Sequence, residues 1–222
     1  MPSRRSRVRI PSPAPLGLSM IKVIGKLPEQ LASAIEKKLL GAQCNWQYAP
    51  STTSYVHEPT HNNPTIKDTQ KFTDDFYIYD QDYKRLGPYR EAIKNPQHRI
   101  PKFFNEINEL VTLVKKRYLE EEHGEFDVFR LMANMQTIRP QWSINAPHPD
   151  HKNKDFWTLL YYVNNSDGDT FFFRGSEVIL QTKPIKGTAV LYHSTTIHAG
   201  STPIHHQTRV VINCVMMPVN NS

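Results

Sequence analysis

The chain has 222 residues, of which 38% are hydrophobic and 10% aromatic, and its mean hydropathy is −0.56. This composition predicts a soluble globular protein, because a disordered chain carries fewer aromatic residues. No apolar run approaches the roughly 18 residues that a membrane-spanning helix needs. The two cysteines, Cys44 and Cys214, are too few for a disulfide framework or a four-cysteine zinc site. With no secretory signal visible, we expect a reducing compartment, namely the cytoplasm.

The formal net charge of +6 overstates the basicity of the folded part. Residues 1–19 contain four arginines and no acidic residue, and without them 23 basic residues face 21 acidic ones. We therefore expect residues 1–19 to be a disordered basic tail or not to belong to the native protein. The second reading rests on Val8-Arg9-Ile10-Pro11, which matches one translated frame of the tRNA T-loop consensus, and it makes Met20 the start. Residues 20–222 are expected to form a single domain.

The front of this domain, residues 20–123, is predicted to be helical. A helix is expected from Pro28 to Gly41, with apolar residues on one face, and a longer one over about 101–122. Residues 42–70 are rich in Ser, Thr, Asn and Pro and predict a long loop. This loop and the Tyr-rich stretch 71–100 are candidates for a substrate lid, or for ordinary packing at the mouth of the domain.

The back of the domain, residues 124–218, has the pattern of a β-sandwich or barrel. Short segments rich in Val, Ile, Phe, Tyr and Thr alternate with Gly, Asn, Asp and Pro. The predicted strands are 125–132, 156–163, 169–174, 177–183, 188–193 and 207–217. The run from Asn164 to Gly168 is expected to be a hairpin turn between two of them.

One of two candidate metal motifs is set aside on physical grounds. His57-Glu58-Pro59-Thr60-His61 has the letters of a zinc metalloprotease motif, which works only on a helix. Pro59 in its middle costs a helix about 3 kcal/mol, and the surrounding sequence predicts a loop. We therefore interpret this match as accidental.

The second motif is His148-Pro149-Asp150, followed 48 residues later by His198. In an extended segment, residues two apart project to the same side, so His148 and Asp150 point together. Two histidines and one carboxylate on one face of a metal form the ligand set of non-haem Fe(II) oxygenases. Zinc enzymes also use this set, and a lone His-x-Asp triplet can simply be a solvated turn.

Arg209 shifts the balance towards an oxygenase. It opens the predicted strand 207–217, where alternation puts Arg209, Val211 and Asn213 on one face. An arginine within an apolar strand is costly unless it faces an anion. Its guanidinium could bind the far carboxylate of a dicarboxylic acid in a bidentate pair.

With these residues, the sequence over about 125–217 resembles the Fe(II)- and 2-oxoglutarate-dependent dioxygenases of the prolyl 4-hydroxylase type. Further segments in register are Leu159–Asn164, Gly168-Asp169-Thr170-Phe171 and Pro184–Tyr192. The second resembles the family's Gly-Gly-x-Thr turn, with Asp169 in place of the second glycine. The resemblance implies a mostly β fold with flanking helices, in which a double-stranded β-helix (a jelly-roll, cupin-like core) packs on the N-terminal helices.

The resemblance also implies roles for single residues. His148, Asp150 and His198 would be the catalytic Fe(II) ligands, and Arg209 would bind the 5-carboxylate of 2-oxoglutarate. Tyr162 aligns with a tyrosine that assists this carboxylate, although it could equally be a core aromatic. The family hydroxylates unactivated C–H bonds, consuming O2 and 2-oxoglutarate and releasing succinate and CO2, with ascorbate as a candidate reductant. The expected substrate is a side chain of a protein or peptide, or a small amino-acid-like molecule.

Three alternatives remain open at this stage. A nucleic-acid demethylase of the same superfamily is disfavoured, because Val215 stands where that subfamily has a second arginine. A non-catalytic cupin-like metal-binding protein would not need Arg209. A structural β-sandwich protein would make the triad a coincidence. The sequence specifies neither the substrate, nor the position hydroxylated, nor the oligomeric state.

Overall fold

The computed structural model describes residues 21–42, 44, 46–49, 71–78 and 104–219. Along the chain the elements are β1 (Ile21–Ile24), α1 (Glu29–Leu39), β2 (Gln47–Ala49), β3 (Lys71–Ile78), α3 (Phe104–Lys115), the π-helical turn η3 (Lys116–Glu120), α4 (Glu121–His123), β4 (Phe126–Thr137), β5 (Trp157–Tyr162), β6 (Thr170–Arg174), β7 (Glu177–Thr182), β8 (Ala189–His193), β9 (His198–Gly200) and β10 (Thr208–Pro218). None of the helices in these ranges is long and apolar enough to cross a membrane.

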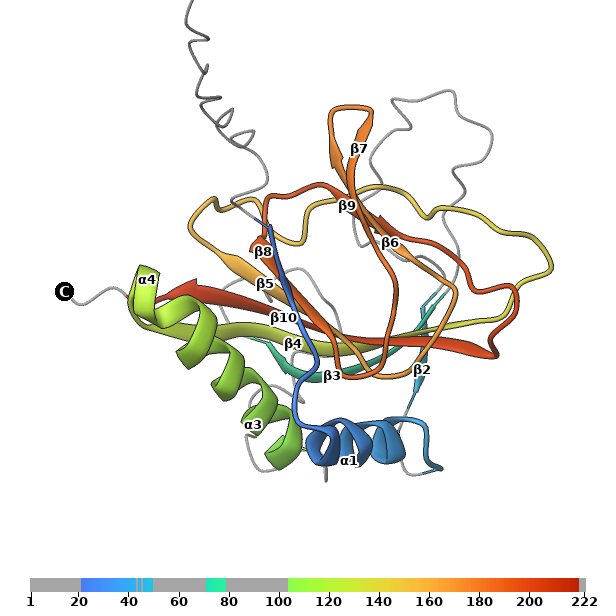
Figure 1. Cartoon of the computed structure of the whole chain (residues 1–222), viewed down its shortest axis with the longest axis horizontal. Coiled ribbons are helices and arrows are strands. Elements are labelled where there is room, and N and C mark those ends of the chain that lie inside the picture. Colours follow the sequence, from blue (N-terminus) through green and yellow to red (C-terminus); the bar gives the residue numbers. More distant parts are fainter. Residues whose placement is uncertain (1–20, 43, 45, 50–70, 79–103, 220–222) are drawn as a thin grey trace, which may run out of the picture.

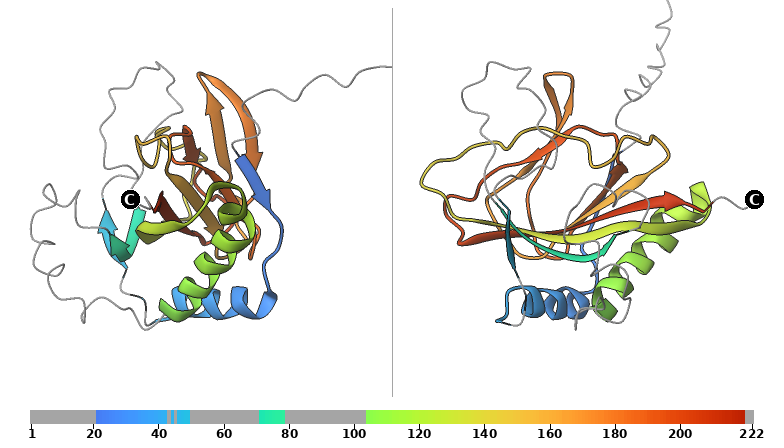
Figure 2. Two further views of the ribbon diagram at one scale, coloured as in Figure 1. Left: turned by 90° about the vertical axis from the view of Figure 1, so that its left-hand side faces the viewer. Right: turned by 180° about the vertical axis from the view of Figure 1, so that it is seen from behind.

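Two antiparallel sheets form the core of the molecule. The large sheet has seven strands in the order β1-β8-β5-β10-β4-β3-β2, and the small sheet has three in the order β7-β6-β9. In Figures 1 and 2, α1 and α3 cover one side of the large sheet and the small sheet lies on its other side. The predicted mostly β fold, a jelly-roll core packed on N-terminal helices, is confirmed.

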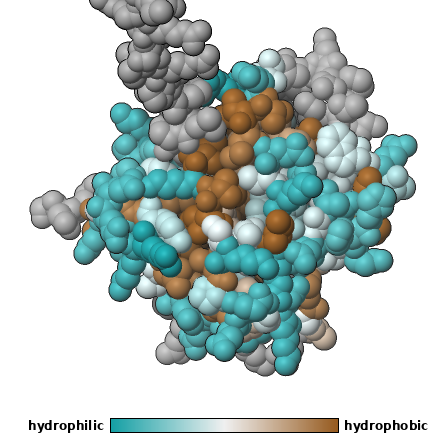
Figure 3. Space-filling view, in the orientation of Figure 1, coloured by the Kyte–Doolittle hydropathy of each residue, from teal (hydrophilic) through white to brown (hydrophobic). Residues whose placement is uncertain are grey.

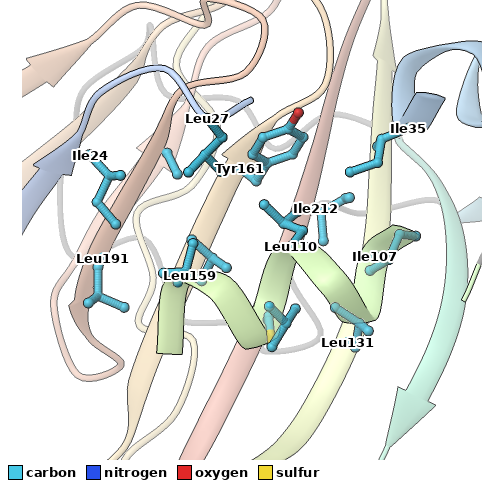
Figure 4. Close-up of a cluster of buried hydrophobic side chains, with 14 of the residues drawn as sticks. Ile24, Leu27, Ile35, Ile107, Leu110, Leu131, Leu159, Tyr161, Leu191 and Ile212 are labelled. Atoms are coloured by element: carbon cyan, nitrogen blue, oxygen red, sulfur yellow. The ribbon is translucent and has the colours of Figure 1, made fainter. Parts of the chain in front are cut away.

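Strand alternation divides the buried side chains into two clusters. Tyr161 faces the helices and Tyr162 faces the small sheet, as the sequence predicts for neighbours in a strand. The helix-side cluster joins α1 and α3 to the large sheet (Figure 4), and its members include Ile24, Leu27, Ile35, Ile107, Leu110, Leu131, Leu159, Leu191 and Ile212. The same side of every central strand therefore provides the apolar surface on which the helices dock.

Both predicted helices are present with small shifts of their ends. α1 begins directly after Pro28, whose fixed φ suits a helix start, and buries Leu31, Ala32, Ile35 and Leu39. The second helix continues from α3 through η3 into α4 and ends at Gly124, which has a φ of 81°. This positive φ favours glycine and explains the stop.

Two predictions about local structure need correction, and one candidate segment can be placed in part. Asn164–Gly168 is not a hairpin turn: β5 pairs with β8 and β10, whereas β6 pairs with β7 and β9, so this loop crosses between sheets. The front of the domain is not purely helical, since β1, β2 and β3 extend the large sheet. Residues 71–78, taken as part of a lid candidate, form β3. The remainder of that candidate, 50–70 and 79–100, lies outside the described residues.

The surface in the view of Figure 1 is mixed in character. Figure 3 shows apolar side chains gathered near the middle of this face, with hydrophilic side chains around them. Large apolar side chains that are exposed in the described part include Val23 on β1 and Val178 on β7. Single exposed apolar residues of this kind are normal on protein surfaces.

Candidate metal centre

The two histidines of the predicted triad are held together by their own backbone. His148 and His198 exchange both backbone hydrogen bonds, at 3.0 and 3.1 Å, in an antiparallel bridge. Asp150 follows two residues later, and its backbone N–H donates to the carbonyl of Ser194 at 2.9 Å. Potential ligand atoms of the three side chains all lie within 4.8 Å of one another. No other such group of three occurs in the described part of the chain.

Hydrogen bonds to carbonyl groups fix the orientation of both imidazoles. Nδ1 of His148 lies 2.9 Å from the carbonyl oxygen of Ala146, and Nδ1 of His198 lies 3.0 Å from that of Thr196. Because a carbonyl oxygen only accepts, each Nδ1 carries the hydrogen. Each Nε2 therefore presents its lone pair, which is the arrangement found in metal-binding histidines.

The electrostatics favour the ligand forms of His148 and Asp150. Burial, reinforced by the neighbouring His198, lowers the pKa of His148 to about 4, so its imidazole is neutral near pH 7. Burial alone would raise the pKa of Asp150. Electrostatic interactions with His198 and with the Arg130 guanidinium outweigh that effect and lower the pKa of Asp150 to about 2. A neutral imidazole and an ionised carboxylate are the forms that bind a metal.

Three side chains that the sequence did not identify hold the carboxylate of Asp150. Oδ1 accepts hydrogen bonds from Asn213 Nδ2 at 2.9 Å and from an Arg130 terminal nitrogen at 3.2 Å. Oδ2 accepts one from the hydroxyl of Tyr192 at 2.8 Å. That hydroxyl is also 3.3 Å from Nε2 of His198. Tyr192 thus borders the space between two potential ligands.

The triad opens into a pocket between the two sheets. The cavity volume of this pocket is about 110 Å³. Its floor is formed by the face of β4 and β10 that is turned towards the small sheet. Alternate residues of the two strands project from this face into the pocket. The lining residues from these two strands are Arg130, Met132, Asn134, Gln136, Arg209, Val211 and Asn213.

Arg209 is buried at the end of this floor, with 5% of its surface exposed. Its guanidinium donates to the carbonyl of Gly168 at 2.6 Å, to Thr170 Oγ1 at 2.8 Å and to Gln136 Oε1 at 3.4 Å. All three acceptors are neutral. Within the described ranges, no carboxylate lies within salt-bridge distance of Arg209. Its charge is therefore available to a bound anion.

Two glycines leave the space that Arg209 occupies. A Cβ at Gly200 would lie 3.1 Å from its Cζ, and one at Gly168 would lie 2.7 Å from its Cδ and 2.6 Å from the carbonyl oxygen of Ser201. Larger residues at either position would displace the guanidinium. Gly168 is the first residue of the turn that resembles Gly-Gly-x-Thr. A glycine is needed there because Arg209 and the backbone of Ser201 pack directly against it.

Tyr162 lies behind the pocket and does not line it. Its hydroxyl donates to Thr170 Oγ1 at 2.8 Å and lies 2.5 Å from Thr182 Oγ1. Thr170, which lines the pocket, thus accepts from both Tyr162 and Arg209. Burial raises the pKa of Tyr162. The hydroxyl of Tyr162 is therefore connected to Arg209 only indirectly, by the hydrogen bonds that both make to Thr170.

The remaining histidines in the described part are not grouped with the triad. His123 stacks on Trp157, His151 stacks on Phe156, His193 Nδ1 bonds to the carbonyl of Lys154, and His205 and His206 are exposed. The discarded motif at His57 and His61 lies outside the described residues.

The residues present fit a ferrous ion and a dicarboxylic cosubstrate. The donor set is two imidazole nitrogens and one carboxylate on one side of a pocket, which leaves coordination positions open. Arg209, buried without a carboxylate partner among the described residues, lies in the same pocket.

No family model matches this sequence, and no curated protein matches it either. Solved structures do match. A 2OG-Fe(II) oxygenase family oxidoreductase from Burkholderia pseudomallei superposes with a TM-score of 0.58 at 13% identity, covering 91% of this chain and 87% of that one. The α-ketoglutarate-dependent epimerase SnoN from nogalamycin biosynthesis gives 0.54 at 12% identity, covering 90% and 78%.

A prolyl hydroxylase from Trichoplax adhaerens, solved in complex with a hypoxia-inducible factor peptide, gives a TM-score of 0.50 at 15% identity, covering 91% of this chain and 85% of that one. These identities are low, so the match concerns the arrangement of the strands and helices. The chain therefore has the fold seen in these 2-oxoglutarate- and Fe(II)-dependent oxygenase structures, which include a prolyl hydroxylase.

Proposed function

We propose that this protein is an Fe(II)- and 2-oxoglutarate-dependent dioxygenase that hydroxylates an unactivated C–H bond. The single observation that carries the proposal is the pocket itself. It combines a His148/Asp150/His198 triad with a buried arginine that has no carboxylate partner in the described residues. A structural metal site would need the triad but not the buried guanidinium, which would only add a desolvation cost.

His148, Asp150 and His198 would hold the iron, with both Nε2 atoms and Oδ2 of Asp150 facing the site. Bound Fe(II) supplies the redox chemistry by which O2 oxidises 2-oxoglutarate to succinate and CO2 and hydroxylates the substrate. The carbonyl groups of Ala146 and Thr196 fix the tautomers of the histidines. Asn213, Arg130 and Tyr192 keep the carboxylate of Asp150 ionised and oriented.

Arg209 would bind the 5-carboxylate of 2-oxoglutarate at the far end of the floor. Thr170 accepts hydrogen bonds from Tyr162 and Arg209 and retains its own hydroxyl hydrogen, which it can donate to the same carboxylate. Tyr162 would support this contact through Thr170, so we assign it an indirect role in cosubstrate binding. Ascorbate remains the expected reductant.

The same proposal covers domain organisation and location. We take residues 20–222 as one catalytic domain, which is supported by the shared core of α1, α3 and the large sheet. Residues 1–19 lie outside the described residues and play no part in the proposed function. The two free cysteines are compatible with the cytoplasm.

For the substrate, we propose a side chain of a protein or peptide, or a small amino-acid-like molecule. The Trichoplax adhaerens relative in fold is bound to a peptide, whereas SnoN is an epimerase, so the fold alone does not select a substrate. Nucleic acid is disfavoured because Val215 occupies the place of the second arginine.

The test is succinate release from 2-oxoglutarate in the presence of Fe(II), O2 and ascorbate, measured against a panel of peptides, free amino acids and nucleosides. We expect turnover that depends on Fe(II) and 2-oxoglutarate and that at least one peptide or amino acid stimulates. Stimulation by nucleosides alone would redirect the assignment to nucleic-acid demethylation. No succinate under any condition, from protein that is folded and loaded with iron, would contradict the proposal.

A further inference from the structure

The floor of the pocket carries a second arginine at the other end of the same ladder. β10 and β4 pair antiparallel, with Arg209 opposite Gln136 at one end and Arg130 opposite Val215 towards the other. Asn213, which bonds to Asp150, lies between them in register with Met132. Arg130 itself reaches Asp150. The two arginines therefore lie at different positions along one surface, with Arg130 next to Asp150.

Arg130 differs from Arg209 in how its donors are used. Arg209 is almost fully buried and distributes its hydrogen bonds over three acceptors. The side chain of Arg130 is 24% exposed, and within the described residues one terminal nitrogen makes both of its hydrogen bonds, to Asp150 Oδ1 and Asn213 Oδ1, each at 3.2 Å. Its Nε is buried and has no hydrogen-bond partner in the same part of the chain. A purely structural arginine would be expected to satisfy more of its five donors.

The charges of the pocket leave Arg130 without a full counterion. Of the described residues that line it, Arg130 and Arg209 carry guanidinium groups, and Asp150 is the one carboxylate. A divalent ion and a dianionic cosubstrate add no net charge, so a positive excess remains. Asp150, the anion beside Arg130, would then be shared with the metal. A partly buried cation in this position is stabilised by a further anion.

Building on the proposed function, we infer that Arg130 recognises a carboxylate of the substrate. Because Arg130 contacts Asp150 directly, an anion on its exposed edge lies close to the metal site. The carboxylate is thus separated by only a few bonds from the carbon that is hydroxylated. This geometry selects a free amino acid or a small organic acid over an uncharged residue within a peptide.

The experiment measures binding and does not require turnover. Protein is loaded with Mn(II) and 2-oxoglutarate without O2, since Mn(II) accepts the same nitrogen and oxygen ligands. Calorimetry then measures the affinity for free amino acids and dicarboxylic acids. The affinity for each acid is compared with that for its carboxamide and with that for a phosphate monoester of similar size. The variants are Arg130→Met and Arg130→Lys, and Lys22→Met, at an exposed ion pair on β1, is the matched control.

For at least one acid we expect wild-type binding about 10- to 100-fold tighter than for its amide, the range of a charge-assisted hydrogen bond. Arg130→Met should abolish this acid-over-amide preference, Arg130→Lys should recover part of it, and Lys22→Met should retain it. Equal binding of acids and amides, no binding of any acid, or a preference for the phosphate monoester would overturn the inference, and the wild-type comparison decides this even if Arg130→Met misfolds.

Failure of the inference is separable from failure of the proposed function. If wild-type protein binds neither Mn(II) nor 2-oxoglutarate, the proposed oxygenase function fails first. If it binds both and shows no acid preference, the function stands and the carboxylate subsite is wrong.

Discussion

The two faces of the large sheet are built from the same strands but carry opposite chemistry. On β10, Val210, Ile212 and Cys214 face the helices in the hydrophobic cluster, whereas Arg209 and Asn213 face the small sheet and line the pocket. One residue along the strand thus separates the side chains that hold the fold together from those that line the pocket. Substitutions on the outer face should change stability, and those on the inner face should change binding and turnover.

The strongest test of this division lies in the triad. Replacing His148 or Asp150 by Ala removes one of the three proposed iron ligands, so we expect succinate formation to be abolished. The measurement is succinate release at saturating Fe(II) and 2-oxoglutarate, with folding checked by circular dichroism. Unchanged turnover in either variant would defeat the assignment of the site.

At the other end of the floor, Arg209→Ala should mainly raise the 2-oxoglutarate concentration that the enzyme requires. Loss of a charge-assisted pair predicts an increase in KM of about 10- to 100-fold. Arg174→Ala, at an exposed position on β6, is the matched control and should keep the wild-type KM. A normal KM in Arg209→Ala would remove the arginine from the cosubstrate site.

On the outer face, Ile212→Ala should reduce the free energy of unfolding by about 2–5 kcal/mol, since Ile212 is fully buried between the sheet and the helices. The KM for 2-oxoglutarate should stay close to the wild-type value. Denaturant unfolding and steady-state kinetics on the same preparation provide both numbers. A large rise in KM with little loss of stability would contradict the assignment of this face to stability alone.

Two tyrosines on opposite faces offer a paired comparison. Tyr192→Phe removes the hydroxyl that donates to Asp150, and the affinity for Mn(II) should fall about 10-fold. Tyr161 presents its hydroxyl to the helix side, where it is buried without a partner among the described residues. Tyr161→Phe should therefore leave Mn(II) affinity unchanged. Equal effects in the two variants would show that the hydroxyl of Tyr192 does not position the ligand.

The smallest expected effect concerns the loop that leads into β10. Asp167 accepts backbone hydrogen bonds from Ile204, His205 and His206. Although burial raises it, these bonds lower the pKa of Asp167 to about 2. Because its pKa is lower in the folded protein than in the unfolded chain, the stabilisation is complete above about pH 4 and declines as the pH falls towards 2.

Asp167→Asn should accordingly melt at a lower temperature than wild type at pH 7, with the difference shrinking between about pH 4 and 2. Thermal unfolding followed over this pH range is the measurement. A difference that stays constant down to pH 2 would mean that the charge of Asp167 does not anchor the loop.

Much of this arrangement could be predicted from the sequence because it depends on local periodicity. Alternation separated Tyr161 from Tyr162 and placed Arg209 on the ligand-binding face, and the triad follows from two short motifs. The hairpin at Asn164–Gly168 was predicted wrongly because turn residues look alike whether the next strand pairs with the last one or crosses to another sheet. β3 escaped prediction because its segment lacks a clear alternation.

The hydrogen-bond partners of Asp150 could not be predicted from the sequence, for a different reason. Arg130, Tyr192 and Asn213 come from three strands, and only the order β8-β5-β10-β4 brings them to one carboxylate. No spacing in the sequence indicates that these three side chains contact the same carboxylate. Arg130 in particular has the appearance of an ordinary surface residue on an alternating strand.

An anaerobic titration of the protein with Fe(II) and 2-oxoglutarate, followed by visible absorption, shows whether the pocket binds both together. We predict that a weak charge-transfer band appears only when both are present, saturates at one equivalent of iron, and is lost in Asp150→Ala. Folded wild-type protein that binds Fe(II) yet develops no band with 2-oxoglutarate would contradict the account.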